Sequence, residues 1–293
     1  MNLENLNIGE IKYNVDLSEY TTYKLKAIGK ILVIPKNINC LIKLIDYIKE
    51  KNLKYKILGN GSNLIFTKPI YEGILIKLNN LNDINIEDDI ITVGAGYNLM
   101  KLSLKASMLG LSGMEFATGI PGSVGGSVYM NAGAYNNSIS DVLISIKALD
   151  DNLNIKEISN KELQFGYRHS ILQEKKYIVI EAKFKLKHGN TNEIMELVNK
   201  RRERRIASQP LEYPSAGSVF RNPTNDYAGR LIEEIGYKGH NRCGAMVSTK
   251  HANFIINTGN ATGEDIKELI IEIKEKVKEK YNIELKVEQE FVE

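Results

Sequence analysis

The 293-residue sequence is poor in the residues that usually identify a disulfide-stapled or metal-binding protein. It contains two cysteines, Cys40 and Cys243, which lie far apart and have no metal-type spacing. Intracellular proteins rarely keep disulfides, so we expect both thiols to be reduced and structural. The four histidines are equally scattered, whereas a zinc site needs several ligands at characteristic short spacings. We therefore expect no metal.

The sequence also lacks an excess of charge of either sign and a long apolar run. Lysine and arginine number 39 against 36 acidic residues, which leaves a net charge of +3 spread along the chain. A nucleic-acid binder usually carries a clustered basic patch. No apolar run approaches membrane-spanning length, and residues 1–20 contain no cationic segment that leads into an apolar core. We expect a cytoplasmic monomer with no nucleic-acid or membrane partner.

Glycine, by contrast, is concentrated in one segment. Five glycines lie among the fifteen residues from Gly119 to Gly133. Apolar residues such as Val124 and the fixed backbone angle of Pro121 distinguish this segment from a flexible linker. Because glycine lets main-chain N–H groups approach a ligand closely, the segment predicts a cradle for phosphate oxygens, as in a dinucleotide.

A second glycine-containing loop covers residues 59–63. It follows a predicted strand at 55–58, the second strand of a βαβ unit that begins with a strand at 31–34. Ligands favour this position in α/β units. The loop could equally be a tight turn, but together with 119–133 it suggests two lips of one elongated pocket. Gly-Ala-Gly at 94–96 lacks the third glycine of a dinucleotide fingerprint and is poor support for a Rossmann site.

Hydrophobic periodicity predicts a mixed α and β chain. We expect a helix on the apolar stripe 41–48, another over 99–109 that stops at Gly110, a third from 192 into the basic run 201–205, and a last one capped by Thr262 with Asp265. We expect strands at 73–78, 84–86, 90–94, 142–150, 154–158 and 177–186, and a strand-like tail at 283–287.

Three polar segments could carry chemistry. Arg168 lies among aromatic residues and could hold a carboxylate with two hydrogen bonds, or could simply pack on tyrosine at the surface. Ser218 has no histidine and acid arranged around it in sequence, so a hydrolase-type nucleophile cannot be inferred, and a turn or capping serine is the alternative. Glu288 and Glu290 would point to one side of a terminal strand, where most glutamates face water.

Taken in order, several segments resemble the UDP-N-acetylenolpyruvoylglucosamine reductase (MurB) family. The resemblance extends from about Tyr20 to Glu288 and rests on the order and spacing of the segments more than on any single one. These segments are 21–24, 59–63, 119–126, 131–135, 167–170, 209–210, 217–223 and 250–255.

The resemblance implies an α+β fold of the vanillyl-alcohol-oxidase/PCMH FAD-binding type. Two α+β subdomains would hold FAD, and a C-terminal α/β domain would bind the substrate. We expect the first subdomain at 1–76, with the tail 283–293 as a candidate addition, the second at 77–190, and the substrate domain at 191–282.

The family resemblance also implies FAD as the cofactor and NADPH as the reducing co-substrate. The matching positions that would contact FAD are Gly59, Asn60, Gly61, Ser62, Asn63, Gly119, Pro121, Gly122, Ser123, Gly125, Gly126, Asn131, Ala132 and Gly133. Neither histidine nor cysteine occurs in these two loops, so we expect FAD to be bound noncovalently.

By the same resemblance, the reaction is reduction of UDP-N-acetylglucosamine enolpyruvate to UDP-N-acetylmuramate in peptidoglycan precursor synthesis. Arg168 matches the arginine that stabilises the developing carboxylate charge. Ser218 matches the serine that donates a proton to the second carbon, and Glu288 matches the glutamate that acts with the arginine. Positions expected near the sugar diphosphate are Tyr167, Arg205, Gln209 and Asn222.

The chain departs from the family pattern in two places. Only His-Gly-Asn-Thr at 188–191 joins the strand near 186 to the next helix, so the chain resembles the shorter class without the tyrosine-loop insertion. The sequence given stops soon after Glu288, which makes Glu290 a rival, although the offset from Leu285 favours Glu288.

Two other functions stay open at this stage. One is a different oxidoreductase with noncovalent FAD on the same fold. The other is a nucleotide-sugar binding protein without catalysis, against which the presence of Arg168, Ser218 and Glu288 argues.

Overall fold

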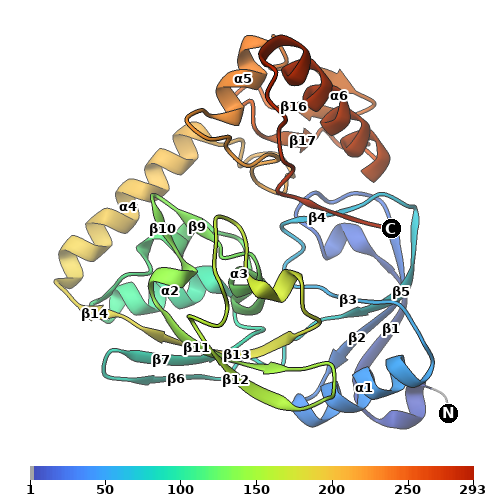
Figure 1. The fold of residues 1–293 in the computed structure, drawn as a ribbon, viewed down its shortest axis with the longest axis vertical. Coiled ribbons are helices and arrows are strands. Elements are labelled where there is room, and N and C mark those ends of the chain that lie inside the picture. Colours follow the sequence, from blue (N-terminus) through green and yellow to red (C-terminus); the bar gives the residue numbers. More distant parts are fainter. Residues whose placement is uncertain (1–2) are drawn as a thin grey trace. The chain divides into compact units, whose positions relative to one another are not determined.

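The computed structural model describes residues 3–293, which fall into two compact units (Figure 1). We call them the first and the second unit. The first unit comprises the described residues up to Lys12, Ile31–Asn60 and Gly73–Glu203, and the second comprises Tyr13–Lys30, Gly61–Glu72 and Arg204–Glu293.

The first unit contains an antiparallel five-stranded sheet with the order β12-β11-β13-β7-β6. Its strands are β6 (Ile84–Glu87), β7 (Ile90–Gly94), β11 (Leu143–Leu149), β12 (Ile155–Ser159) and β13 (Ile178–Lys185). The helices of this unit are α1 (Ile38–Glu50), α2 (Leu99–Met108) and α3 (Val124–Tyr129), with 3-10 turns η1 (Leu3–Leu6), η3 (Glu115–Gly119), η4 (Ile139–Asp141) and η5 (Ile171–Gln173). Short pairs are β8 (Leu111–Ser112) with β14 (Lys187–His188), and β9 (Gly133–Ala134) with β10 (Asn137–Ser138).

A four-stranded sheet has the order β1-β2-β5-β3. Its strands are β1 (Gly9–Asp16), β2 (Ile28–Pro35), β3 (Tyr55–Ile57) and β5 (Ile70–Ile76). Strands β3 and β5 are parallel, with Tyr55 opposite Ile74, and helix α1 connects β2 to β3. Because β1, β2 and β5 each contain residues of both units, the unit boundaries fall within strands.

Helices α1 and α2 form where apolar stripes predicted helices. The Asn37 side chain caps α1 by accepting from the Cys40 N–H at 3.0 Å. Leu41, Leu44 and Ile48 on the predicted stripe are fully buried in the core of this unit. Helix α2 ends one residue before Leu109, and Gly110 follows with φ +72, the left-handed angle that stops a helix at low cost.

The glycine segment is not one continuous loop. Its first residues close the 3-10 turn η3, and the Ser123 side chain then caps α3, whose residues include Gly125 and Gly126. None of the glycines in 119–133 has a positive φ. These glycines therefore allow close packing and do not supply an unusual backbone angle. The sequence alone does not distinguish between these two roles of glycine.

The second unit has its own core around a long helix. Its remaining elements are η2 (Leu17–Glu19), β4 (Leu64–Phe66), α5 (Ala228–Glu234), β15 (Asn241–Arg242), β16 (Ala245–Val247), β17 (Ile255–Asn257), α6 (Gly263–Tyr281) and β18 (Glu290–Val292). The predicted capping box of α6 is confirmed: Asp265 N–H donates to Thr262 Oγ1 at 3.2 Å, and Thr262 N–H donates to Asp265 Oδ2 at 2.8 Å. Helix α6 buries Ile266, Leu269 and Ile273 fully.

The predicted strand at 283–287 is wrong. In this stretch only Val287 bridges to another segment, at Phe220, and the terminal strand is β18, parallel to β4 with Glu290 opposite Leu64. Alternation of apolar residues marks a chain that could pair, but the register depends on the partner strand. Here β4 lies more than 200 residues away in sequence, and Glu288 falls between the bridge and β18 rather than within a strand.

The three-domain division stays a prediction. Helix α4 (Thr191–Ser208) begins one residue after the expected boundary at 190, and the contact-based boundary between the two units falls inside it, after Glu203. In residues 3–293, no helix has both the length and the apolar character needed to span a bilayer.

Candidate active site

The two predicted cofactor loops meet inside the first unit. A Cβ placed on Gly59 would lie 2.7 Å from Ser123 Oγ, a distance that no real Cβ contact tolerates. A side chain at residue 59 would therefore force the capping Ser123 hydroxyl of α3 to move. One residue of each predicted loop thus lies next to the other, and the shared cofactor pocket stays a prediction.

Other glycines of the segment serve close packing. A Cβ on Gly125 would lie 2.9 Å from Ala95 Cβ, and one on Gly133 would lie 2.4 Å from Asn137 O. Gly125 N–H donates to Ala95 O at 2.8 Å, and Gly126 N–H donates to Ser123 Oγ at 3.3 Å. These two amides have partners within the protein, and the space beside Gly125 is filled by Ala95.

Arg168 lies in a tight turn next to the far end of the glycine segment. Gly166 and His169 exchange two main-chain hydrogen bonds, and Arg168 takes φ +56, an uncommon angle for a side chain of its size. Its guanidinium donates to Gly133 O at 2.7 Å and lies 5.1 Å from the centre of the Tyr167 ring. Asn131 Nδ2 donates to Gly166 O at 2.9 Å. The structure thus joins Arg168 directly to Gly133, and it joins the turn that carries Arg168 to Asn131.

The remaining part of the first loop belongs to the second unit. Gly61 has φ +62, and a Cβ there would lie 2.4 Å from Tyr20 O. Thr22 N–H donates to Gly61 O at 3.3 Å, while the buried Thr22 Oγ1 has no hydrogen-bond partner within residues 3–293. An unsatisfied buried hydroxyl next to a glycine loop is the arrangement expected where a polar ligand binds.

Ser218 and Glu288 are brought together in the second unit. Glu288 N–H donates to Val219 O at 2.8 Å, directly after Ser218. Asn63 Nδ2 donates to Glu288 O at 3.2 Å, so a predicted cofactor residue contacts the same stretch. The rival Glu290 lies one step further, in β18, where its N–H donates to Asn63 O at 2.8 Å. Glu288 is therefore the glutamate that adjoins Ser218.

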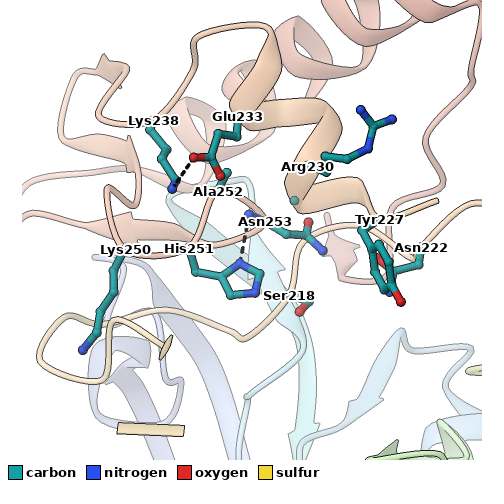
Figure 2. A pocket seen from close by; sticks show the side chains of 11 residues that line it. Ser218, Asn222, Tyr227, Arg230, Glu233, Lys238, Lys250, His251, Ala252 and Asn253 are labelled. Atoms are coloured by element: carbon teal, nitrogen blue, oxygen red, sulfur yellow. Dashed lines mark hydrogen bonds and ion pairs between the residues drawn. The ribbon is translucent and has the colours of Figure 1, made fainter. Parts of the chain in front are cut away.

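Ser218 and Asn222 line a pocket of about 360 Å³ (Figure 2). The other side chains around it include three cations, a carboxylate and a histidine: Arg230, Lys238, Lys250, Glu233 and His251. Lys238 Nζ lies 2.7 Å from Glu233 Oε1, and the Arg230 guanidinium pairs with Asp226 and Glu234. Such a polar, partly cationic pocket suits an anionic ligand such as a nucleotide sugar.

The four predicted substrate residues are divided between the units. Tyr167 is in the first unit with an exposed side chain, and Arg205, Gln209 and Asn222 are in the second. Gln209 Oε1 is buried and has no partner within the described chain, whereas Asn222 Oδ1 accepts from Ala228 N–H at 3.1 Å. Gln209 thus presents an unused acceptor.

Two residues near these sites were missed by the sequence analysis. Lys77 is buried, donates to Gly59 O at 2.7 Å, and burial lowers the pKa of its ammonium to about 8. His251 lines the Ser218 pocket. A lone lysine in the apolar run 74–78 was an available signal for the first. The second belongs to the segment 250–255, which supported the resemblance without receiving a role.

Comparison with known proteins decides the family. Residues 209–292 match the family model described as UDP-N-acetylenolpyruvoylglucosamine reductase, C-terminal domain, and residues 29–159 match an FAD binding domain. A UDP-N-acetylenolpyruvoylglucosamine reductase of Caldanaerobacter subterraneus subsp. tengcongensis is 43% identical over 289 residues, which covers 99% of this chain and 96% of the relative. The chain belongs to the UDP-N-acetylenolpyruvoylglucosamine reductase family. The namesake enzyme of Anoxybacillus flavithermus is also 43% identical, over 98% of this chain and 95% of its own.

Solved structures agree with this family assignment. The crystal structure of the UDP-N-acetylenolpyruvylglucosamine reductase of Thermus caldophilus matches with a TM-score of 0.83 at 33% identity, over 97% of this chain and 98% of that one. A protein of Physcomitrella patens named BBE-like 1 matches at 14% identity with a TM-score of 0.51, over 64% of this chain and 45% of its own. The second likeness concerns the fold alone.

Family membership confirms the resemblance and the fold class predicted from the sequence. The match to an FAD binding domain confirms FAD as the cofactor, and the named relatives confirm a reductase. The roles of individual residues stay predictions.

Proposed function

We propose that this chain reduces UDP-N-acetylglucosamine enolpyruvate to UDP-N-acetylmuramate, a step of peptidoglycan precursor synthesis, with bound FAD and with NADPH as the reductant. The observation that carries the residue assignment is the 2.8 Å hydrogen bond from Glu288 N–H to Val219 O. This hydrogen bond keeps the Glu288 segment next to the Ser218 segment, so that a carboxyl group and a hydroxyl group come from neighbouring stretches. Ser218 also lines a pocket large enough for part of a nucleotide sugar.

The residues present fit an FAD. The buried Thr22 hydroxyl, which has no partner within residues 3–293 and lies next to the glycine loop, is a polar group that a cofactor can satisfy. The residues predicted to hold the cofactor are Asn60, Ser62, Asn63 and those named in 119–133. When bound, FAD supplies the hydride that the enolpyruvyl double bond receives. Since neither histidine nor cysteine occurs in these loops, the attachment is noncovalent.

The protein's own side chains would stabilise the negative charge that develops on the substrate and supply the proton that the substrate receives. Reduction at the terminal carbon builds negative charge on the neighbouring carbon and its carboxylate. We assign Arg168 to stabilise that charge, because a guanidinium matches a carboxylate with two hydrogen bonds. Ser218 donates a proton to the second carbon, and Glu288 acts with Arg168 as a hydrogen-bonding partner.

Four further residues would hold the sugar diphosphate. Tyr167, Arg205, Gln209 and Asn222 supply an aromatic face, a cation and two amides, which suit a pyrophosphate and a sugar. Among these four residues, Gln209 gives the strongest support for a role in substrate binding, because its buried Oε1 accepts no hydrogen bond within residues 3–293. We further propose that the protein is a cytoplasmic monomer. Its partner is this small-molecule substrate, with no nucleic acid or membrane involved.

Two measurements test the function. NADPH should be consumed steadily only when the enolpyruvyl sugar nucleotide is present, and absence of substrate-dependent consumption would overturn the proposal. Ser218→Ala should leave flavin reduction by NADPH within about twofold of wild type. It should slow reoxidation of the reduced flavin by the substrate roughly 10²-fold or more, the usual scale for loss of a general acid.

The matched control is Ser159→Ala, since Ser159 is exposed at the end of β12 in the first unit and its hydroxyl donates to Glu162. It should leave both half-reactions unchanged. If Ser218→Ala slows both half-reactions equally, Ser218 is not the proton donor.

A further inference from the structure

His251 occupies the same pocket as Ser218 and has no role in the function proposed above. Both side chains line the cavity of about 360 Å³. Figure 2 shows the imidazole ring beside the Ser218 side chain, with the ring nitrogen that makes no drawn hydrogen bond turned toward it.

One hydrogen bond fixes the form of the ring. Asn253 N–H donates to His251 Nδ1 at 3.2 Å, so Nδ1 is an acceptor. In the neutral imidazole the proton must then be on Nε2. The nitrogen that faces Ser218 is therefore a donor.

Asn253 also fixes the segment that carries Ser218. Its main-chain carbonyl accepts from Val219 N–H at 2.9 Å, and its side-chain Oδ1 accepts from Phe220 N–H at 2.9 Å. Asn253 Nδ2 returns a hydrogen bond to Phe220 O at 2.8 Å, and the residue is only 4% exposed. One buried residue thus holds both the histidine and the serine segment in place.

The surroundings favour the neutral form of the histidine. Burial, the largest effect, lowers the pKa of His251 below its ordinary 6.5, and Lys238 lowers it further, whereas a hydrogen bond to its own main chain and the Glu233 carboxylate raise it. The other charged groups on the pocket are Lys250, whose ammonium donates to Ile206 O at 2.7 Å, and Arg230 with its carboxylate partners. The ring also packs against Phe254, with 4.8 Å between the ring centres.

We propose that His251 is the positioning residue for Ser218. Neutral His251 donates its Nε2–H to Ser218 Oγ, so that the hydroxyl hydrogen of the serine is left to point at the substrate. As the reaction proceeds, the O–H bond of Ser218 breaks and a C–H bond forms at the second carbon. The electron pair stays on Oγ, the hydrogen bond from His251 stabilises that charge, and water then restores the proton. This inference rests on the proposed function.

The test compares His251→Ala and His251→Gln in the FAD-loaded enzyme. His251→Ala should slow flavin reoxidation by the substrate roughly ten- to a hundredfold, the scale for removing one donor to a developing oxyanion. Flavin reduction by NADPH and KM for the sugar nucleotide should change less than about twofold. His251→Gln keeps an N–H donor near the Nε2 position and should recover most of the lost rate.

The pH profile separates positioning from simple packing. In wild type the reoxidation rate should fall as pH drops below 6.5, because the imidazolium carries a proton on Nδ1 and cannot accept from Asn253. His251→Gln does not titrate, so this acid limb should be absent from its profile. A variant His188→Gln, at an exposed site in the first unit, should behave as wild type.

Combining the variants tests whether His251 acts through Ser218. In the Ser218→Ala background, His251→Ala should cause no further loss, because the group it serves is gone. Additive losses, equal slowing of both half-reactions, or a His251→Gln variant as slow as His251→Ala would each overturn the inference. If wild type shows no substrate-dependent turnover, the proposed function fails instead. Normal slowing by Ser218→Ala with no effect of His251→Ala refutes only the role of His251.

Discussion

Lys77 shows how one residue can connect the core of a unit with its predicted cofactor loop. Its stem lies in the apolar run at the end of β5, and its ammonium donates to Gly59 O, the position where the two glycine loops meet. Burial disfavours the charged form, which is why its pKa falls to about 8. The residue therefore costs stability while it holds the loop.

This cost gives a pH-dependent prediction. In the unfolded chain Lys77 keeps its proton up to about 10.5, so between pH 8 and 10.5 the unfolded state binds more protons than the folded state. The free energy of unfolding of the apoprotein should therefore rise with pH, by about 2 kcal/mol between pH 8 and 10, relative to Lys77→Met. Urea unfolding of both proteins at the two pH values measures it.

The control is Lys54→Met, which removes an exposed lysine near the start of β3. Its pH dependence should match that of wild type. Other groups in the protein titrate in this range, among them buried Tyr23, whose pKa is raised by burial, but they are common to all three proteins. Parallel curves for wild type and Lys77→Met would contradict the prediction.

At the scale of elements, the cap of α6 should matter to the second unit. Thr262 and Asp265 satisfy each other's N–H groups at the start of a helix whose inner face is fully buried. Loss of such a cap usually costs about 1 kcal/mol. Thr262→Ala should lower the free energy of unfolding by about that amount in urea titration without changing FAD content, and Thr262→Ser should restore it. Equal stability of all three proteins would show that the box contributes nothing.

Elements governed by local signals were predictable from the sequence. The capping box of α6, the stripe of α1 and the stop at Gly110 all lie within a few residues of the helices they define, and each appears in the structure. The prediction of a strand at 283–287 was wrong because the terminal strand, β18, is defined by its pairing with β4, and no local sequence pattern specifies that pairing. Short helix α3 was hidden because two of its six residues are glycines, which usually weaken a helix.

The candidate site was predictable in composition but not in its contacts. Order and spacing of motifs identified the family and named Arg168, Ser218 and Glu288. No spacing could show that Gly59 approaches Ser123, or that Arg168 donates to Gly133, since these pairs are brought together by tertiary packing. His251 was overlooked because its neighbour Ser218 is distant in sequence.

At the scale of the molecule, the two units do not follow the order of the chain. Segments 13–30 and 61–72 pack with the C-terminal residues, so the loop 59–63 is divided between the units after Asn60. The predicted boundaries did not group 13–30 and 61–72 with the C-terminal residues, because a core assembled from three separate segments gives no compositional signal. Predicted cofactor residues accordingly occur in each unit.

That distribution leads to a prediction about FAD removal. A ligand that binds only the folded protein stabilises it by about 2.7 kcal/mol at a hundred times its Kd. Apoprotein should therefore unfold at a lower temperature than the FAD-loaded protein, and added FAD should raise the unfolding temperature again.

Amide hydrogen exchange shows which segments FAD stabilises. FAD should slow exchange at residues 59–63 and 119–133 but not in the turn Asp151–Asn154 between β11 and β12. Protection confined to 119–133 would remove residues 59–63 from the proposed cofactor site.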